Sequence, residues 1–386
     1  MVWYQVYQYQ YSTVVLVPYL AWLAWYGYGY PILISVDLCG VVSVSVVSID
    51  LSSSSMCSSS RLTGKIILDF TAGIFFLLLA LILATSFSKF PLVHPNGAVL
   101  ITGASSGIGL SAAKHLQSQG FHVFAACRKE KDAQRLTNVG LNPLIIDVTK
   151  ESTIDEAVLA VTRYVKTSGI PLVSIINNAG STTKKPLETV DMRVVRQVFD
   201  VNVFGALEVT QKFLPLLRET VEAGGGARIV FIGSVSGIIS LPLNGVYSMT
   251  KYSMEAMADT YRRELHKFGI SVSMVNPAYV NTNFRQRGAD TVKEDSLTLN
   301  EKKNYGQDFA HLVKKMNKRG TFAATCCDVT DTAIANAVIS AYPKTRYYPA
   351  VVAPHVPAWI VTPLIRSFGI FTMTDRILDS IIRMAF

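Results

Sequence analysis

The stretch AVLITGASSGIGL, residues 98–110, decides the fold of this chain of 386 residues. A short apolar run leads into a glycine-rich turn and then into a helix-like segment from about Ile108 to Gln119. Glycine lets the backbone turn sharply and approach a phosphate closely, while the following helix directs free N–H groups at it. The spacing G-x-x-x-G-x-G between a strand and a helix therefore indicates a dinucleotide-binding turn, although a turn without ligand is the alternative.

Five further apolar runs follow this turn, each separated from the next by a segment that can hold a helix. They are rich in β-branched residues and do not alternate with polar ones, which is typical of strands buried on both faces. The runs cover residues 122–127, 143–148, 172–177, 228–232 and 270–276, and a seventh strand is expected at 346–352. The pattern predicts an α/β fold, a Rossmann-like doubly wound parallel sheet of about seven strands, over residues 96–353.

The region before this domain has a different composition. All 36 lysines and arginines follow residue 60, and residues 1–60 form a low-complexity hydrophobic region that ends in a Ser-rich tract. Residues 70–88 carry no charge and come close to the roughly 20 residues that cross a bilayer. We therefore predict a transmembrane anchor at residues 66–88, with a buried globular helix as the alternative. Residues 354–386 are expected to form a hydrophobic C-terminal extension.

Charge and cysteine content exclude two classes of site. The net charge is +9, yet no basic run with interleaved aromatic residues occurs, which argues against a nucleic-acid partner. The spacing of the five cysteines fits neither a zinc site nor a disulfide framework, so no metal site is expected.

The end of the second predicted strand bears on the choice of cofactor. NAD sites usually place Asp or Glu there to bind the ribose, whereas this chain has Cys127, Arg128 and Lys129. A guanidinium suits a 2′-phosphate, so we expect Arg128 to favour NADP(H), with NAD(H) as the alternative and an ordinary loop arginine as the competing interpretation. Asp147, at the end of the third strand, is a candidate acceptor for the adenine amino group.

A tyrosine and a lysine form the candidate catalytic pair. Tyr247 is the only one of the 17 tyrosines with a lysine four residues on, Lys251, and on a helix this spacing puts both on one face. A free tyrosine has a pKa near 10, and a neighbouring cation lowers it toward the range of a general acid or base. Ser234 follows the fifth strand, where its hydroxyl could bind a substrate oxygen.

Together these motifs resemble the short-chain dehydrogenase/reductase family. The matching features are TGxxxGIG at 102–109, NNAG at 177–180, YxxxK at 247–251 and a serine thirteen positions before the tyrosine. Within the family, the chain is most similar to the retinol, hydroxysteroid and 3-hydroxybutyrate dehydrogenase group. One departure is Pro277-Ala278, where the family usually has Pro-Gly, and we expect it to tighten the loop without abolishing cofactor binding.

The resemblance implies a set of site residues. The catalytic residues would be Asn202, Ser234, Tyr247 and Lys251, with Asn202 binding a water linked to the lysine. The cofactor-binding residues would be Gly103, Ser105, Ser106, Gly107, Ile108, Gly109, Arg128, Asp147, Val148, Asn178, Ala179, Gly180, Tyr247, Lys251, Pro277, Val280 and Thr282.

The sequence therefore predicts a membrane-anchored oxidoreductase that transfers a hydride between NADP(H) and the carbonyl or alcohol carbon of a lipophilic substrate. A retinoid, a steroid or an acyl ketone is the expected substrate, and residues 283–320 are the expected substrate lid. One alternative is a biosynthetic sphingoid-base or steroid ketoreductase, and another is a non-catalytic cofactor-binding scaffold protein. The endoplasmic reticulum is a candidate membrane, and a homodimer is a candidate assembly.

Overall fold

The computed structural model describes residues 32–36, 42–46, 89–292, 296–320, 328–353 and 356–357. The chain divides into two units, Met1–Leu81 and Ile82–Phe386. In the first unit, β1 (Ile32–Val36) and β2 (Val42–Val46) pair in antiparallel fashion. The predicted anchor at 66–88 lies outside these residues. Of the C-terminal extension predicted at 354–386, the structure describes only Val356–Pro357. None of the helices that the structure describes combines the length and the apolar character needed to cross a bilayer.

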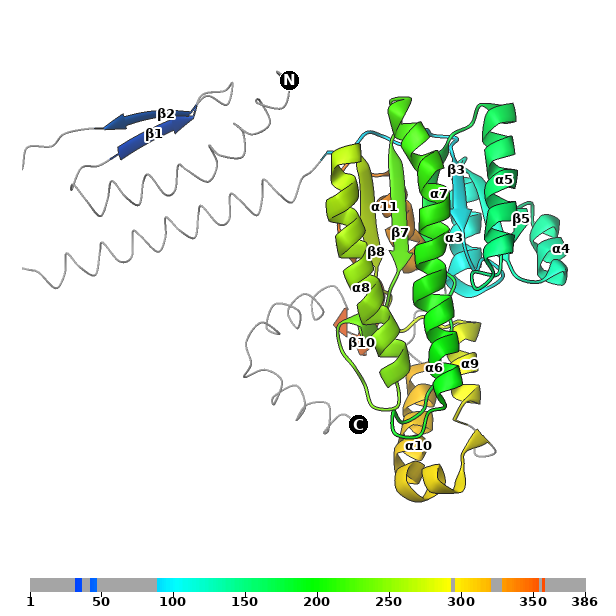
Figure 1. The fold of residues 1–386 in the computed structure, drawn as a ribbon. Coiled ribbons are helices and arrows are strands. Elements are labelled where there is room, and N and C mark those ends of the chain that lie inside the picture. The colour runs from blue at the N-terminus through cyan, green and yellow to red at the C-terminus, as the bar shows by residue number, and fades with distance from the viewer. Residues whose placement is uncertain are drawn as a thin grey trace, which may run out of the picture. The chain divides into compact units, whose positions relative to one another are not determined.

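A seven-stranded parallel sheet forms the centre of the second unit (Figure 1). Its strands are β3 (Ala98–Ile101), β4 (His122–Cys127), β5 (Asn142–Ile145), β6 (Leu172–Asn177), β7 (Ala227–Ile232), β8 (Ile270–Val275) and β9 (Arg346–Tyr347). Their order is β5-β4-β3-β6-β7-β8-β9, so the chain changes direction across the sheet between β3 and β6. Such a switch point opens a crevice at the carboxyl ends of the strands, where ligands bind in open α/β sheets.

The predicted strands are present, and two of them differ from the prediction by more than one residue at an end. The third strand ends three residues early, at Ile145. The seventh strand comprises only Arg346–Tyr347, which pairs with β8, because the chain then turns through Ala350 at a positive φ of 71°. The later part of the predicted run, β10 (Val351–Ala353), pairs instead with β11 (Val356–Pro357).

Helices cover both faces of the sheet (Figure 1). One face packs against α3 (Gly107–Ser118), α4 (Glu130–Asn138) and α11 (Asp328–Ile339). The other face packs against α5 (Glu151–Ser168), α7 (Gly205–Glu222) and α8 (Gly245–Leu265). The helix α6 (Met192–Phe199) is joined to α7 by a π-helical segment at Asp200–Phe204, and α8 ends in a 3₁₀ turn at His266–Phe268.

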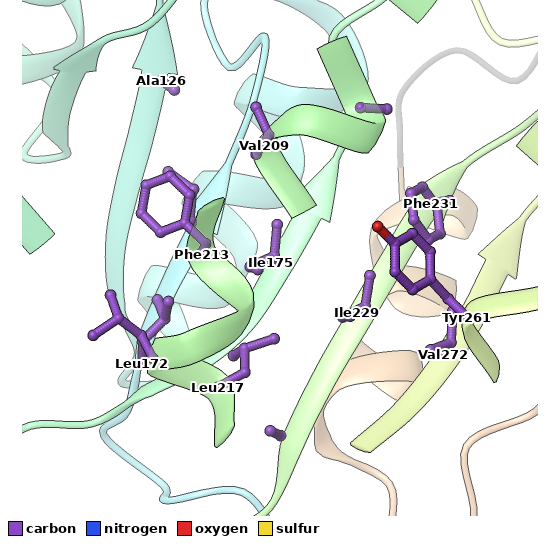
Figure 2. Packing of buried hydrophobic residues seen from close by; sticks show 14 of the residues in the cluster. Ala126, Leu172, Ile175, Val209, Phe213, Leu217, Ile229, Phe231, Tyr261 and Val272 are labelled. Atoms are coloured by element: carbon purple, nitrogen blue, oxygen red, sulfur yellow. The ribbon is translucent and has the colours of Figure 1, made fainter. Parts of the chain in front are cut away.

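Successive side chains of each central strand enter opposite clusters of the core. In β3, Leu100 packs toward α5 and α7, while Val99 and Ile101 pack toward α3 and α11. Figure 2 shows Phe213 of α7 beside Ile175 of β6 in the first cluster. Each fully buried side chain of this size contributes about 1.5–3 kcal/mol. Burial on both faces explains why β3 is apolar throughout instead of alternating, whereas β8 carries the buried serines Ser271 and Ser273.

The predicted lid consists of two helices with a small core of their own. They are α9 (Asn283–Asp290) and α10 (Leu299–Gly320). The buried members of this core are Leu243, Val292, Phe309, Leu312 and Met316. The lid sequence is mainly polar and basic, and apolar residues occupy the positions that are buried in this small core.

A buried carboxylate fastens α10 to the loop that follows β6. Glu301 and Thr298 form a capping box at the start of α10, with backbone-to-side-chain hydrogen bonds of 2.8 and 3.2 Å. Lys185 Nζ lies 2.8 Å from Glu301 Oε2, and the Thr189 hydroxyl donates to Oε1 at 3.0 Å. Burial opposes ionisation of Glu301, but these hydrogen bonds, chiefly from Lys185, hold its pKa below the ordinary value. The lid is therefore attached to the loop after β6 by a buried carboxylate whose charge is paired with Lys185.

Candidate active site

A cavity of about 650 Å³ opens at the carboxyl ends of the strands, a volume typical of small-molecule sites. All of the predicted cofactor-binding residues except Gly109 line it. Ser234, Tyr247 and Lys251 also line it, whereas Asn202 does not. The structure thus brings nearly the whole predicted set to one cavity.

The glycine-rich turn forms one wall of this cavity. The helix α3 begins at Gly107, and the Ser106 side chain makes no capping hydrogen bond to it. The N–H groups of the first helical turn are therefore left for an anion. Gly103 has φ +66°, and a Cβ atom there would come within 2.8 Å of the Ala179 Cα. A bare backbone beside a helix N-terminus fits the pyrophosphate of a dinucleotide.

Behind this wall, the turn is locked to the loop that follows β6. The Asn178 amide donates to the carbonyl oxygens of Thr102 and Gly103 at 2.8 and 3.1 Å. The Thr102 hydroxyl accepts the N–H groups of Asn178 and Ala179, both at 3.0 Å. A Cβ atom at Gly109 would overlap the Asn178 amide and come within 2.7 Å of the Gly103 carbonyl oxygen. Gly109 therefore serves close packing of the turn, and Thr102, the first residue of the TGxxxGIG motif, holds the two loops together.

The end of β4 presents a cationic edge to the cavity. Arg128 and Lys129 are exposed and line it together with Cys127 and Asp132. Burial raises the pKa of the Cys127 thiol, so this residue stays neutral. Asp132 pairs with Arg135 at 3.1 Å, whereas Arg128 forms no ion pair with any residue that the structure describes. This edge suits an anionic group such as a 2′-phosphate.

Asp147 borders the same end of the cavity but has a structural task as well. Its Oδ1 accepts the backbone N–H of Thr149 at 3.1 Å and the Thr149 hydroxyl at 2.8 Å. These bonds fix the turn that leads into α5. The other carboxylate oxygen is the one left for a ligand.

The candidate catalytic residues meet where β7 and α8 approach each other. Tyr247 and Lys251 lie one turn apart on α8, and the Lys251 ammonium is 5.6 Å from the centre of the Tyr247 ring. The Tyr247 hydroxyl is hydrogen-bonded to Ser234. The Ser234 oxygen accepts the Ser236 N–H at 3.1 Å, while Lys251 Nζ donates to the Ile232 carbonyl at 2.7 Å. A phenol, a hydroxyl and an ammonium thus converge on one wall of the cavity.

The protonation of this group differs from the sequence-based expectation. Burial raises the pKa of Tyr247 to about 12, only partly offset by the hydrogen bond with Ser234. Burial also lowers the pKa of Lys251 to about 7, since the Ile232 carbonyl and the Met254 sulfur, its hydrogen-bond partners, carry no charge. The expectation that Lys251 would bring the tyrosine pKa toward neutrality is therefore wrong for this structure. Burial is the largest influence on the pKa of Tyr247, and the phenol is protonated at neutral pH.

Asn202 lies in the π-helical segment and is completely buried. Its Oδ1 accepts the Ser181 N–H at 2.7 Å, and its amide donates to the Ser181 carbonyl and the Thr250 hydroxyl, both at 2.9 Å. The side chain therefore joins the loop after β6 to α8 and does not reach Lys251. The water link between Asn202 and Lys251 that the resemblance implies stays a prediction.

The chain matches the short chain dehydrogenase family over residues 97–293, just over half of its length. It belongs to the short-chain dehydrogenase/reductase family of NAD(P)-dependent oxidoreductases. Relatives named as retinol dehydrogenases and as D-beta-hydroxybutyrate dehydrogenases confirm the group predicted from the motifs.

Three relatives and one solved structure indicate how far the similarity extends. The uncharacterized oxidoreductase YbbO of Escherichia coli K12 is 41% identical over 48% of this chain and 66% of its own, slightly under two thirds. Retinol dehydrogenase 7 of Rattus norvegicus is 35% identical over 64% of this chain and 79% of its own. An NADPH-dependent 3-dehydrocapnine reductase of Ornithobacterium rhinotracheale is 30% identical over 73% and 94%. A short-chain dehydrogenase structure from Streptomyces avermitilis has a TM-score of 0.57 at 23% identity, covering 73% of this chain and 98% of its own, and supports the fold.

The far wall of the cavity in this family member comes partly from the predicted lid at 283–320 and partly from residues that the sequence did not mark. They are chiefly Lys184, Leu241, Asn244, Phe284, Leu312 and Met316. The Lys184 ammonium donates to Asn244 Oδ1 and lies 5.7 Å from the Tyr247 ring, and the Phe284 ring centre is 5.5 Å from that ring. These residues come from a loop, a turn and two helices, so no local pattern in the sequence connects them.

Proposed function

We propose that this protein is an NADP(H)-dependent carbonyl reductase or alcohol dehydrogenase in which Tyr247 exchanges a proton with a lipophilic substrate. The observation that carries the proposal is the meeting of Tyr247, Ser234 and Lys251 on one wall of the cavity, with the pKa of the tyrosine raised to about 12 by burial. A neutral phenol at physiological pH is suited to donate a proton to a ketone oxygen.

The glycine-rich turn, the start of α3 and the loop after β6 are assigned to the dinucleotide, with Arg128 directed at its 2′-phosphate. The nicotinamide, when bound, supplies or accepts the hydride. Preference for NADP(H) is supported by the cationic pair Arg128 and Lys129 in place of an acid at the end of β4. It is also supported by a relative described as NADPH-dependent.

The proton is handled by three residues of this chain. Ser234 accepts a hydrogen bond from Ser236 N–H, which leaves its own hydroxyl proton for the substrate oxygen or for Tyr247. During reduction Tyr247 donates its proton to the ketone oxygen as carbon accepts the hydride, and during oxidation the same proton returns from the alcohol. Lys251, in its charged form, stabilises the phenolate that remains. Proton transfer of this kind is worth about 10²–10⁴-fold in rate.

The substrate end of the cavity favours a lipophilic compound. Leu241, Phe284, Leu312 and Met316 provide an apolar lining, while Lys184 and Asn244 add polar groups near the tyrosine. We therefore assign a retinoid, a steroid or an acyl ketone as the substrate class. Attachment to a membrane by residues 66–88, with the endoplasmic reticulum as the candidate membrane, rests on the sequence, as do the limits of the catalytic domain at 96–353 and of the C-terminal extension.

The test is a substrate panel with full-length protein in detergent micelles. Absorbance at 340 nm is followed with NADPH or NADH and with retinal, a ketosteroid, a long-chain acyl ketone or a sphingoid ketone, beside a Tyr247→Phe control. We expect NADPH oxidation that falls about 10²–10⁴-fold in the control while NADPH binding is retained. A preference for a sphingoid ketone would select the biosynthetic ketoreductase. Cofactor binding without turnover of any carbonyl would favour a scaffold protein and contradict the proposal.

A further inference from the structure

A completely buried asparagine, Asn276, contacts the backbone of Ser234 from outside the cavity and has no part in the proton transfer described above. Asn276 follows β8 and does not line the cavity. Its Oδ1 accepts the backbone N–H of Ser234 at 3.0 Å, and its amide donates to Glu255 Oε1 at 2.5 Å. Its own N–H donates to the Tyr347 carbonyl at 2.8 Å. The side chain of Asn276 thus joins Ser234 to α8.

The carboxylate on the far side of Asn276 is held in turn by an arginine. Glu255 is buried and lies two helical turns beyond Tyr247 on α8. Its Oε2 accepts Arg346 Nε at 2.8 Å, and Arg346 also pairs with Asp259 at 2.6 Å. A chain of polar contacts therefore leads from β9 through α8 to the residue that donates a hydrogen bond to the substrate oxygen.

This chain of contacts fixes which way the asparagine amide points. An ionised carboxylate only accepts hydrogen bonds, so Glu255 requires the NH₂ group of Asn276 on its side. The oxygen of the amide must then face Ser234, whose N–H it accepts. Because the Ser234 oxygen is at the same time held by Ser236 N–H, the backbone and the side-chain oxygen of Ser234 are both fixed, and its hydroxyl proton is left for the substrate oxygen or for Tyr247.

We infer that Asn276 is a positioning residue for Ser234, with Glu255 and Arg346 setting the orientation of its amide. The inference rests on the proposed function, in which Ser234 binds the substrate oxygen. Residues in one hydrogen-bond network have non-additive effects, so the action of Asn276 through Ser234 can be measured as a coupling in kcat.

The experiment is a double-mutant cycle of Asn276→Ala and Ser234→Ala in the full-length protein, with a ketone that the wild type reduces. We expect Asn276→Ala to lower kcat about 10–100-fold in the wild-type background, in line with the loss of a buried hydrogen bond to a catalytic group. In the Ser234→Ala background, we expect it to lower kcat less than threefold. The KM for NADPH should change little in either background.

A matched control, Ser273, lies three residues before Asn276, on β8. The Ser273 hydroxyl donates to the Lys344 carbonyl at 2.8 Å and is equally buried. Ser273→Ala therefore removes a contact between β8 and the segment before β9 without touching Ser234, and kcat should stay within twofold of the wild type.

A reciprocal exchange guards against a variant that simply fails to fold. Asn276→Asp alone sets two carboxylates against each other, and kcat should fall at least as far as in Asn276→Ala. Adding Glu255→Gln restores one donor and one acceptor at each contact, because the glutamine NH₂ faces Asp and its oxygen faces Arg346. We expect the pair to recover kcat at least tenfold over Asn276→Asp, and recovery of the melting temperature without recovery of kcat would contradict the inference.

The outcomes separate this inference from the proposed function. Equal losses of kcat from Asn276→Ala in both backgrounds would show a general structural role and overturn the inference while leaving the proposed function intact. Full kcat in Ser234→Ala would instead overturn the proposed role of Ser234, and Asn276 would then have no residue to act through. Loss of kcat in the wild-type background alone supports both.

Discussion

The two ends of the cavity are built in different ways. The cofactor end is largely backbone, since the turn after β3 and the first turn of α3 present N–H groups and bare glycines beside the loop after β6. The substrate end is made of side chains that reach in from the turn at 241–244 and from α9 and α10. The cofactor end is packed against a large hydrophobic cluster of the sheet, and the substrate end is packed partly against the small core of the lid.

This difference bears on how each end tolerates change. A backbone site requires particular glycines and fails when a side chain is added. A side-chain site can be reshaped one residue at a time, because volume changes in a small core cost less than a displaced backbone. Substrate preference is therefore expected to vary more easily than cofactor binding, and the following variants test that contrast.

The largest effect is expected at the junction of the two ends, at Lys251. Burial lowers its pKa from 10.5 to about 7, so between these pH values the unfolded chain holds a proton that the folded chain does not. The contribution of Lys251 to the free energy of unfolding should therefore rise with pH from about 7 to 10.5, by on the order of 5 kcal/mol. Urea titrations across this range measure the slope.

Lys251→Met should remove this contribution to the slope, whereas Lys166→Met, at an exposed position on α5, should leave it unchanged. If the free energy of unfolding changed with pH equally in the wild type and in Lys251→Met, Lys251 would be hydrated. Water would then reach the place where the two ends of the cavity meet.

A pair of glycine variants tests the backbone-built end. Gly109→Ala places a Cβ atom against the Asn178 amide and the Gly103 carbonyl, and we expect about 1–3 kcal/mol of lost stability together with at least tenfold weaker NADPH binding. Gly306→Ala on α10 has open space around it and should stabilise the protein by about 0.5–1 kcal/mol. Thermal melts and fluorescence titration with NADPH measure both, and similar values for the two variants would refute the close-packing explanation.

Cofactor choice is expected to depend on one side chain at the cofactor end. Arg128→Ala should weaken NADPH binding about 10–30-fold, because a charge-assisted pair with the 2′-phosphate is lost, and should leave NADH binding unchanged. Lys131→Ala is the control, since Lys131 is exposed on α4 outside the cavity lining. If Arg128→Ala weakened the binding of NADPH and NADH equally, Arg128 would not contact the 2′-phosphate.

The smallest effect is expected at the side-chain end. Leu312→Ala should lower kcat/KM for a long-chain ketone about tenfold through lost apolar contact, while NADPH binding stays the same. The neighbouring Val313 is 37% exposed and does not line the cavity, so Val313→Ala should have little effect. A change in NADPH binding in Leu312→Ala would show that the two ends are not independent.

Much of the cofactor end could be predicted from the sequence, for a physical reason. A glycine-rich turn between a strand and a helix, and a tyrosine four residues before a lysine, are local patterns whose geometry follows from the strand and helix repeats. The predicted strands are present for the same reason, because burial on both faces requires apolar runs. The seventh strand was predicted too long, since the turn at Ala350 depends on contacts with β8 and the loop after it.

By itself, the sequence determined the doubly wound sheet, the phosphate-binding turn and the identity of Ser234, Tyr247 and Lys251. Only the tertiary structure decided that desolvation, not the nearby cation, dominates the pKa of Tyr247, because burial depends on every element packed around a group. It also decided the side-chain partners of Asn202, the lining of the substrate end, and the contact of Asn276 with Ser234 across 42 residues of sequence. Such contacts join separate segments, and their geometry is set by packing.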